Sequence, residues 1–484
     1  MLLRGARKRN PSIVTYALSW GIPWWPGNGS YFTPDTISYH VAWLKCIRDV
    51  ADTNINYLGV WNERSWGGVD YILSLRSALD AAGFGNTGIV IGDDGGNADD
   101  FVKLGRANAT FAAAVAAIGI HYPCVVAGAS AVEALGWKFW ASEDWWCGYD
   151  WAGAGCYART IARNWLSSRM TGTVAWSLIW STYSNLPDQD AGLMQAQTPW
   201  SGAYTASPPL WAAAHFGQFT AVGWRLLTDG RGSGHLSRGG SYIGFVPPLD
   251  AADGGDFTLV FETTEGACKH CNDAPSVQGP QSVRVRLTGG LASDGTTLAV
   301  WASNATTQFT QQTTIVVSGG GYFNLTLPRD AIVTVTTLRN GSHGGVVSPP
   351  KSPFLLPYVD DFDGNRYAYD ALGRFWGDQA GSWAVRNGSF NQVAEADPAS
   401  NGWIPSGPPF TMLGPMPVPG DATATAFANV SVVVGASFGA SMTRPVLGGA
   451  RANGDSAVLS QCDGSDLQRW AFTPEGGSEC KSIM

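Results

Sequence analysis

The chain has 484 residues, enough for several domains, and its composition already excludes some classes of protein. Charged residues make up 14% of it, the formal net charge is −8 and the pI is about 5.2. Because the longest basic cluster is Arg7, Lys8 and Arg9, we expect no nucleic-acid partner. The longest apolar stretch, residues 111–120, is too short for a membrane-spanning helix of roughly 20 residues, so we expect no transmembrane segment.

Short β-branched or aromatic runs alternate with helical stretches up to about residue 215, which is the pattern of parallel βα units. The first helix is expected at residues 38–50. The expected strands lie at residues 13–20, 56–63, 88–93, 117–122, 138–143 and 172–180. An eight-unit α/β barrel usually needs about 250 residues. We therefore predict that residues 1–219 form a (β/α)8 TIM barrel that lacks its first two βα units.

The helical period disappears beyond residue 219. Alternating apolar and polar residues at 257–262, 282–287 and 331–338 are typical of antiparallel strands. We predict a β-sandwich over residues 220–345.

The rest of the chain predicts smaller β modules. Residues 346–358 form a Pro-rich linker, and the β-type sequence at 359–450 suits a lectin-like jelly-roll domain that is incomplete. Near the end, Gln468, Arg469 and Trp470 resemble the closing motif of a ricin-type β-trefoil repeat. We interpret residues 451–484 as the possible start of such a repeat.

Cysteines and glycosylation motifs indicate passage through the secretory route. The eight cysteines show no paired zinc pattern, only Cys268 and Cys271 at CxxC spacing, so we expect no metal site. Asn-x-Ser/Thr motifs begin at Asn28, Asn108, Asn304, Asn324, Asn340, Asn387 and Asn429. We therefore expect a lysosomal or secreted protein with disulfides. Because the first ten residues lack the apolar core of a signal peptide, we expect that the natural protein begins further upstream.

Two glutamates occupy the positions where a barrel enzyme carries its chemistry. Glu63 and Glu143 each end a predicted strand, three βα units apart, and side chains at such ends converge on the substrate. Retaining cleavage of a glycosidic bond needs one carboxylic acid and one carboxylate about 5 to 5.5 Å apart. The alternative is that both are surface residues at loop edges. We favour the catalytic pair because the two positions have matching register.

The sequence around these glutamates resembles the galactocerebrosidase family of glycoside hydrolases. Trp-Asn-Glu at 61–63 is followed three βα units later by Ser-Glu-Asp at 142–144. Further matching segments lie at residues 8–13, 57–65, 119–123, 153–156, 173–178 and 192–202. The resemblance extends through the expected sandwich to the Asp-Asp-Phe at 360–362 and does not include the C-terminal tail.

The resemblance implies a role for each site residue. It makes Glu63 the acid/base and Glu143 the nucleophile of a retaining mechanism that uses no cofactor. It places Trp20, Asn62 and Trp176 in the substrate pocket, where an indole can face the apolar side of a sugar. Core packing is the alternative explanation for the tryptophans.

The same resemblance implies a disulfide from Cys156 to Cys268, which would tie the barrel to the sandwich. Three positions depart from the family pattern. Trp146 replaces a serine three residues after the nucleophile, His270 an arginine and Asp188 a sugar-contacting tyrosine. These departures concern the sugar specificity and leave both glutamates in place.

The expected substrate is galactosylceramide or a related β-galactoside, with a lipid-presenting activator protein as a possible partner. One alternative is a retaining β-glycosidase for another sugar, such as a β-glucoside or glucosylceramide. Another is a carbohydrate-binding remnant without activity. His121 also ends a predicted strand, where it can reach the pocket or hold neighbouring groups, and we leave it outside the catalytic set.

Overall fold

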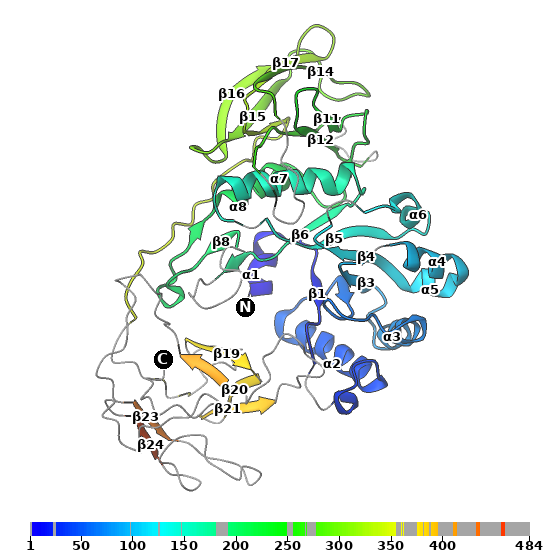
Figure 1. Cartoon of the computed structure of the whole chain (residues 1–484), viewed down its shortest axis with the longest axis vertical. Helices are drawn as coiled ribbons and strands as arrows, with labels where there is room; N and C mark the ends of the chain where they lie inside the picture. The colour runs from blue at the N-terminus through cyan, green and yellow to red at the C-terminus, as the bar shows by residue number, and fades with distance from the viewer. Residues whose placement is uncertain are drawn as a thin grey trace.

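A computed structural model gives the fold shown in Figure 1. It describes residues 2–354, apart from 23–25, 97, 124–125, 147, 181–191, 249–254, 267 and 269–276, together with residues 360, 362 and 375 and six short strands beyond them. Within these residues, no helix is both long enough and apolar enough to cross a membrane.

Six parallel strands form the N-terminal sheet, in the same order as in the sequence. They are β1 (Tyr16–Leu18), β2 (Tyr57–Gly59), β3 (Gly88–Asp94), β4 (Val115–His121), β5 (Lys138–Asp144) and β6 (Gly172–Ala175). β3 and β4 are buried almost throughout, as expected of strands with helices on one face and packed side chains on the other. The expected αβ pattern of parallel strands is confirmed.

Among the described helices, one precedes the first of these strands, six lie between them and one follows the last. They are α1 (Leu2–Arg9), α2 (Pro34–Ala51), α3 (Val69–Ala81), α4 (Asp99–Ala107), α5 (Ala109–Ala114), α6 (Ala129–Glu133), α7 (Trp151–Leu166) and α8 (Pro208–Gly217), with short 3-10 turns η1 (Pro26–Gly29) and η2 (Pro199–Ser201). α2 begins four residues before its predicted start, because Thr33 caps it by accepting from the Thr36 N–H and Pro34 suits the first turn. Asp150 caps α7 by accepting from the Gly153 N–H at 2.9 Å.

The parallel sheet is curled, as three aromatic rings on its strands show. Trp140 of β5 packs edge-on against Tyr57 of β2 at 4.7 Å between ring centroids, and against Tyr16 of β1 at 6.0 Å. β5 is not a neighbour of β1 or β2 in the sheet, so the Trp140 ring meets the two tyrosine rings across the concave side of the sheet. This curvature is that of a TIM barrel. Among the described strands, β1 and β6 are the two ends of the sheet and do not pair with each other.

Three expected strands are longer than the observed ones. The segment 13–20 contributes only Tyr16–Leu18 to the sheet, and 56–63 only Tyr57–Gly59. The segment 172–180 divides: β6 ends at Ala175, and β7 (Ile179–Trp180) pairs with β8 (Met194–Gln195), which pairs with β9 (Thr205–Ala206). Runs of apolar residues in the sequence predict where the strands lie. The residue at which each strand ends is set by contacts between distant parts of the chain.

Antiparallel strands follow α8. They are β10 (Arg225–Leu226), β11 (Gly234–His235), β12 (Ser241–Val246), β13 (Thr258–Glu262), β14 (Gln281–Arg286), β15 (Thr297–Ser303), β16 (Thr310–Val316), β17 (Tyr322–Leu327) and β18 (Ile332–Thr336). Seven of them form one sheet, while β14 and β17 form a separate pair. Apolar side chains of both sheets share one core, which includes Leu298 and Val335 from the larger sheet and Phe323 from the pair.

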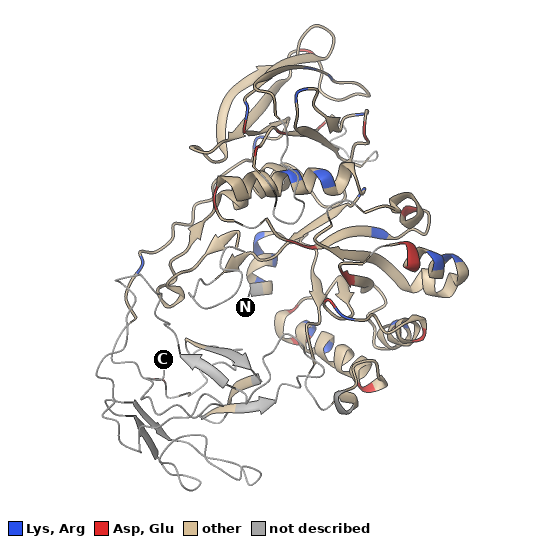
Figure 2. Cartoon of the chain, in the orientation of Figure 1, with Lys and Arg blue, Asp and Glu red and all other residues tan. Residues whose placement is uncertain are grey.

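Beyond residue 375 the described elements are short. They are β19 (Trp376–Ala380), β20 (Ser382–Arg386), β21 (Ser389–Ala394), β22 (Phe410–Leu413), β23 (Val432–Gly435) and β24 (Ser456–Leu459), which form three separate pairs. The Gln468, Arg469 and Trp470 motif lies outside the described residues. In the part of the chain that Figure 2 colours, Lys and Arg are scattered over separate elements, with a short run on α1.

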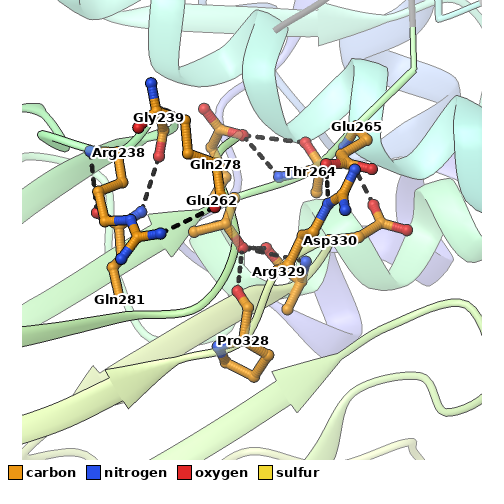
Figure 3. Close-up of polar contacts among 12 residues, drawn as sticks. Arg238, Gly239, Glu262, Thr264, Glu265, Gln278, Gln281, Pro328, Arg329 and Asp330 are labelled. Atoms are coloured by element: carbon orange, nitrogen blue, oxygen red, sulfur yellow. Dashed lines mark hydrogen bonds and ion pairs between the residues drawn. The ribbon is translucent and has the colours of Figure 1, made fainter. Parts of the chain in front are cut away.

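α7 is tied to the segment that follows β13. Cys156 of α7 forms a disulfide with Cys268, with 5.2 Å between the Cα atoms. Arg159 is buried and donates to the carbonyl oxygens of Thr264 at 3.2 Å and Gly266 at 2.6 Å. Figure 3 shows further contacts of the same segment, among them the Glu265 N–H, which donates to Asp330 at 3.0 Å. The helix that follows the Glu143 strand is therefore fixed against the antiparallel sheets.

We expect reduction of this disulfide to lower the melting temperature. The bond closes a loop with a sequence separation of 112 residues, for which chain entropy predicts a stabilisation of about 4 to 5 kcal/mol. Calorimetry of a Cys156→Ala, Cys268→Ala double variant against the wild type measures it, and full reduction of the wild type with dithiothreitol should lower the melting temperature at least as far. Cys46→Ser is the control, since Cys46 is unpaired and exposed. An unchanged melting temperature after full reduction would contradict the expectation.

Candidate active site

The ends of the parallel strands are held together by backbone hydrogen bonds. The Asn62 N–H donates to the Ser19 carbonyl at 2.8 Å, and the Glu63 N–H to the Asp93 carbonyl at 2.8 Å. Further along the sheet, the Tyr122 N–H donates to the Glu143 carbonyl and the Trp176 N–H to the Asp144 carbonyl, both at 2.9 Å. These bonds join neighbouring strand ends beyond the regular ladder, so they fix the backbone from which the site side chains project.

Local irregularities turn the side chains at these ends. The strand register shifts between Gly92 and Asp94, between Ile120 and His121, and between Ala141 and Asp144. Three non-glycine residues at the same ends have a left-handed backbone: Glu63 at φ 48°, Asp93 at φ 53° and Tyr122 at φ 49°. Bulges and left-handed residues re-aim side chains and gather at functional sites. The bulges and the left-handed residues lie at the end of the sheet that carries the two predicted glutamates.

The two predicted glutamates lie close together, with His121 between them. An oxygen of Glu63, an oxygen of Glu143 and a ring nitrogen of His121 all lie within 4.8 Å of one another. His121 Nδ1 is 3.1 Å from Glu63 Oε1 and 3.8 Å from Glu143 Oε2. The His121 side chain is fully buried, Glu143 is 8% exposed and Glu63 is 25% exposed. Glu63 is thus the more accessible carboxylate.

Tyr122 holds Glu143 from the other side by donating its hydroxyl to Glu143 Oε1. Burial raises the pKa of Glu143 above its ordinary value, and the charges of Glu63 and Asp93 raise it further. The hydrogen bond from Tyr122 and the charge of His121 oppose this rise. Tyr122 therefore favours the ionised form of a carboxylate whose pKa burial raises.

Asp144 points away from this cluster toward α7. It is buried and accepts from Asn164 Nδ2 at 2.8 Å, and the same nitrogen lies 3.0 Å from Thr173 Oγ1. Burial raises the pKa of Asp144 to about 7, and the hydrogen bond from Asn164 opposes the rise. Adjacent carboxylates on β5 thus face different surroundings, and Asp144 links the strand to its helix.

The residues predicted to bind the substrate differ in burial and in their contacts. Asn62 is fully buried, and both polar atoms of its amide lack a hydrogen-bond partner among the described residues. Trp20 is 38% exposed and lies nearly parallel to Trp176, with 6.4 Å between ring centroids and 16° between the planes. Trp176 also packs edge-on against Trp145 and Trp180. Both tryptophans therefore follow strand ends at the same edge of the sheet as Glu63 and Glu143.

The three departures from the family pattern have different outcomes. Trp146 is 1% exposed and packs on Tyr157 of α7, with 4.6 Å between ring centroids, so it belongs to a core and not to the pocket surface. His270 and Asp188 lie outside the described residues. Trp146 therefore provides no hydroxyl in place of a serine.

Three residues at this site were not among the predicted set: Asp93, His121 and Tyr122. Each follows or ends a predicted strand, which is the signal that identified Glu63 and Glu143. His121 lies outside the catalytic set expected from the sequence, yet its ring nitrogen Nδ1 contacts both glutamates. His121, Glu63 and Glu143 are also spaced to ligate one metal ion, and the described part of the chain holds no other such group. A metal there would occupy the same carboxylates that glycosidic cleavage needs.

We expect Tyr122→Phe to shift the acidic limb of the pH–rate profile to higher pH. Its hydroxyl lowers the pKa of Glu143, so its loss raises that pKa, and the ionised form then requires a higher pH. A hydrogen bond to a charged group contributes about 1.5 to 3 kcal/mol, which corresponds to a shift of roughly 1 to 2 pH units. A kcat/KM profile measures the limb, with the exposed Tyr149→Phe as control. A limb that stays in place would show that Tyr122 does not control ionisation of Glu143.

A curled parallel sheet with two facing carboxylates at its strand ends defines a class, the barrel glycoside hydrolases. The comparisons with known proteins give the particular family. The model of glycosyl hydrolase family 59 matches residues 1–218, and the model of its central domain matches residues 229–342. The chain belongs to glycosyl hydrolase family 59.

Its relatives include enzymes of vertebrates. The galactocerebrosidase of Danio rerio is 36% identical over 378 residues, covering 75% of this chain and 54% of the relative. That of Homo sapiens is 34% identical over 375 residues, with coverage of 75% and 53%. The chain thus spans about half the length of the curated relatives it matches.

Some solved structures have a similar fold although their sequences share little identity with this chain. A family 30 xylanase from Clostridium acetobutylicum superposes with a TM-score of 0.52 at 18% identity, covering 69% of this chain and 82% of that one. SrfJ from Salmonella typhimurium gives 0.50 at 17% identity, with coverage of 69% and 71%. At these identities the likeness concerns the fold alone.

Proposed function

We propose that this chain carries the active site of a retaining β-galactosidase that removes galactose from galactosylceramide and related galactolipids. The observation that carries the proposal is the Glu63 and Glu143 pair, whose nearest ligand oxygens lie within 4.8 Å. Retaining enzymes place their carboxyl groups about 5 to 5.5 Å apart, whereas inverting enzymes leave roughly 6.5 to 9.5 Å for a water molecule. The short separation favours direct attack by a carboxylate.

The surroundings of the two glutamates support different roles. Glu143 is the nucleophile, because it is almost buried and Tyr122 stabilises its ionised form. Glu63 is the acid/base, because its greater exposure lets it reach both a leaving group and an incoming water. His121 contacts Glu63 and can hold the orientation of its carboxyl group.

The reaction has two steps. Glu143 attacks C1 of the galactosyl group while Glu63 gives its proton to the glycosidic oxygen, so the C1–O bond to the lipid breaks and a glycosyl-enzyme ester forms. Glu63, now ionised, removes a proton from water, and the resulting hydroxide attacks C1 and releases Glu143. The anomeric configuration is retained because C1 is inverted twice. No step needs a cofactor or a metal.

Three further residues support a sugar ligand. Asn62 has a buried amide whose donor and acceptor atoms find no partner in the described part of the chain, which suits hydrogen bonds to sugar hydroxyls. Trp20 and Trp176 offer flat apolar surfaces near the strand ends. The choice of galactose over other sugars draws on the galactocerebrosidase relatives.

Hydrolysis of matched aryl glycosides tests the sugar. We expect aryl β-galactoside to be cleaved faster than aryl β-glucoside, with β-galactose as the first product seen by NMR. If the glucoside is cleaved as well as the galactoside, the specificity assigned here is wrong. If α-galactose appears first, the retaining mechanism is wrong.

The proposal also includes the domains of the chain, its location and its partner. The two sheets of residues 220–345 form a β-sandwich beside the barrel of residues 1–219, residues 346–358 link it to a lectin-like domain at 359–450, and residues 451–484 begin a trefoil-type repeat. The shared core of β14, β17 and the larger sheet supports the sandwich. The protein acts in the lysosome or outside the cell, and a lipid-presenting activator protein delivers its substrate.

A further inference from the structure

Asp93, at the end of β3, touches the site through its backbone. Its carbonyl accepts the N–H of Glu63 at 2.8 Å, and its own backbone is left-handed with φ 53°. Aspartate tolerates this conformation better than most residues. Asp93 is 1% exposed, so it is a carboxyl group kept inside the barrel. Asp93 takes no part in the two-step reaction.

The side chain of Asp93 fits a space left for it by glycines on both neighbouring strands. A Cβ atom at Gly119 would lie 2.4 Å from Asp93 Oδ1, and one at Gly59 would lie 2.8 Å from Asp93 Oδ2. Both distances are shorter than real Cβ contacts. Tyr16 of β1 reaches into the same space and donates its hydroxyl to Asp93 Oδ1 at 2.6 Å. The carboxyl group is thus held in one position by its surroundings.

Two polar atoms at this place lack partners. Asp93 Oδ2 and His121 Nε2 are both buried without a hydrogen bond among the described residues, and Asp93 Oδ1 is 4.0 Å from His121 Nε2. Leaving a buried donor and a buried acceptor unpaired costs free energy. A movement of about 1 Å, or one bridging water, would join His121 Nε2 to the Asp93 carboxyl group through Oδ1, the oxygen that also accepts from Tyr16.

The other ring nitrogen of His121, Nδ1, faces Glu63, the proposed acid/base. His121 Nδ1 lies 3.1 Å from Glu63 Oε1, so the imidazole stands between the buried Asp93 and Glu63. A carboxylate on one ring nitrogen fixes the orientation and tautomer of a histidine and the direction in which its other nitrogen acts. The geometry points to Asp93 as a positioning residue that pairs with His121 and thereby aims Nδ1 at Glu63. This inference rests on the proposed role of Glu63.

Asp93→Asn tests it, because asparagine keeps the shape and an acceptor for Tyr16 but removes the negative charge that would pair with the His121 ring. We expect kcat/KM to fall about tenfold for an alkyl β-galactoside, whose poor leaving group needs the proton of Glu63. For 2,4-dinitrophenyl β-galactoside, which needs little protonation, we expect a change within about twofold. The matched control is Asp100→Asn, since Asp100 is an exposed residue of α4 that pairs with Lys103 at 3.0 Å.

A second variant keeps the test open if Asp93→Asn does not fold. Tyr16→Phe removes the donor that holds Asp93 and should give the same difference between the substrates in weaker form. An equal loss on both substrates, or no loss on either, would overturn the role of Asp93 while the glycosidase function stands. If the wild type cleaves neither substrate, the proposed function fails first and this inference fails with it.

Discussion

Glu143→Gln should reduce turnover of every β-galactoside by about four orders of magnitude, because no other group can form the glycosyl-enzyme. This loss corresponds to roughly 5 kcal/mol of transition-state stabilisation. Glutamine has nearly the same shape and still accepts from Tyr122, so the fold should be kept. Steady-state kinetics with a dinitrophenyl galactoside measures the effect, since with this substrate the acid step is not limiting.

Glu133→Gln provides the matched control. Glu133 is an exposed residue of α6 whose carboxylate lies 3.6 Å from Arg169, away from the strand ends. The control should keep full turnover and a wild-type melting temperature. If Glu143→Gln retains more than a few per cent of activity after contamination is excluded, Glu143 is not the nucleophile.

Glu63→Ala should have the next largest effect, and the effect should depend on the leaving group. General acid catalysis contributes about 10² to 10⁴-fold, so alkyl galactosides should lose that factor in kcat/KM. A dinitrophenyl galactoside should still form the glycosyl-enzyme at close to the wild-type rate. Its turnover then slows because Glu63 no longer activates water for the second step.

Azide makes this second prediction specific to the acid/base role. The anion needs no general base, and the space vacated by the Glu63 side chain admits it. Added azide should therefore restore turnover of the variant and give β-galactosyl azide as product. Equal loss on good and poor leaving groups without rescue would mean that Glu63 supports the fold or binding instead.

The course of the N-terminal sheet could be predicted from the sequence because its strands are short apolar runs between helical stretches. All the expected parallel strands are present, and β3 and β5 match the prediction to within one residue. The ends of β1, β2 and β6 could not be predicted in the same way. Beyond the regular ladder, the Asn62 N–H bonds to the Ser19 carbonyl. The ends of these strands therefore depend on a contact between residues that are far apart in the sequence.

The site could be predicted in part, for the same reason. A strand-end position identified Glu63 and Glu143, and it would also have identified Asp93, His121 and Tyr122 if every polar strand end had been included. The sequence gives no sign of which ends carry bulges or left-handed residues, and those decide which side chains converge. Trp146 shows the reverse case, because its position after the nucleophile suggests a pocket residue while its ring is buried against Tyr157.

The most direct test of the catalytic pair is to trap the intermediate. The wild type is incubated with 2-deoxy-2-fluoro-β-galactosyl fluoride, digested, and the labelled peptide is sequenced by mass spectrometry. The fluorine slows release of the sugar more than its attachment, so the ester accumulates. We predict one fluorogalactosyl group per chain, on Glu143, with release accelerated by an acceptor alcohol. A label on Glu63 or on another carboxylate, with Glu143 unmodified in an enzyme that turns over, would contradict the assignment.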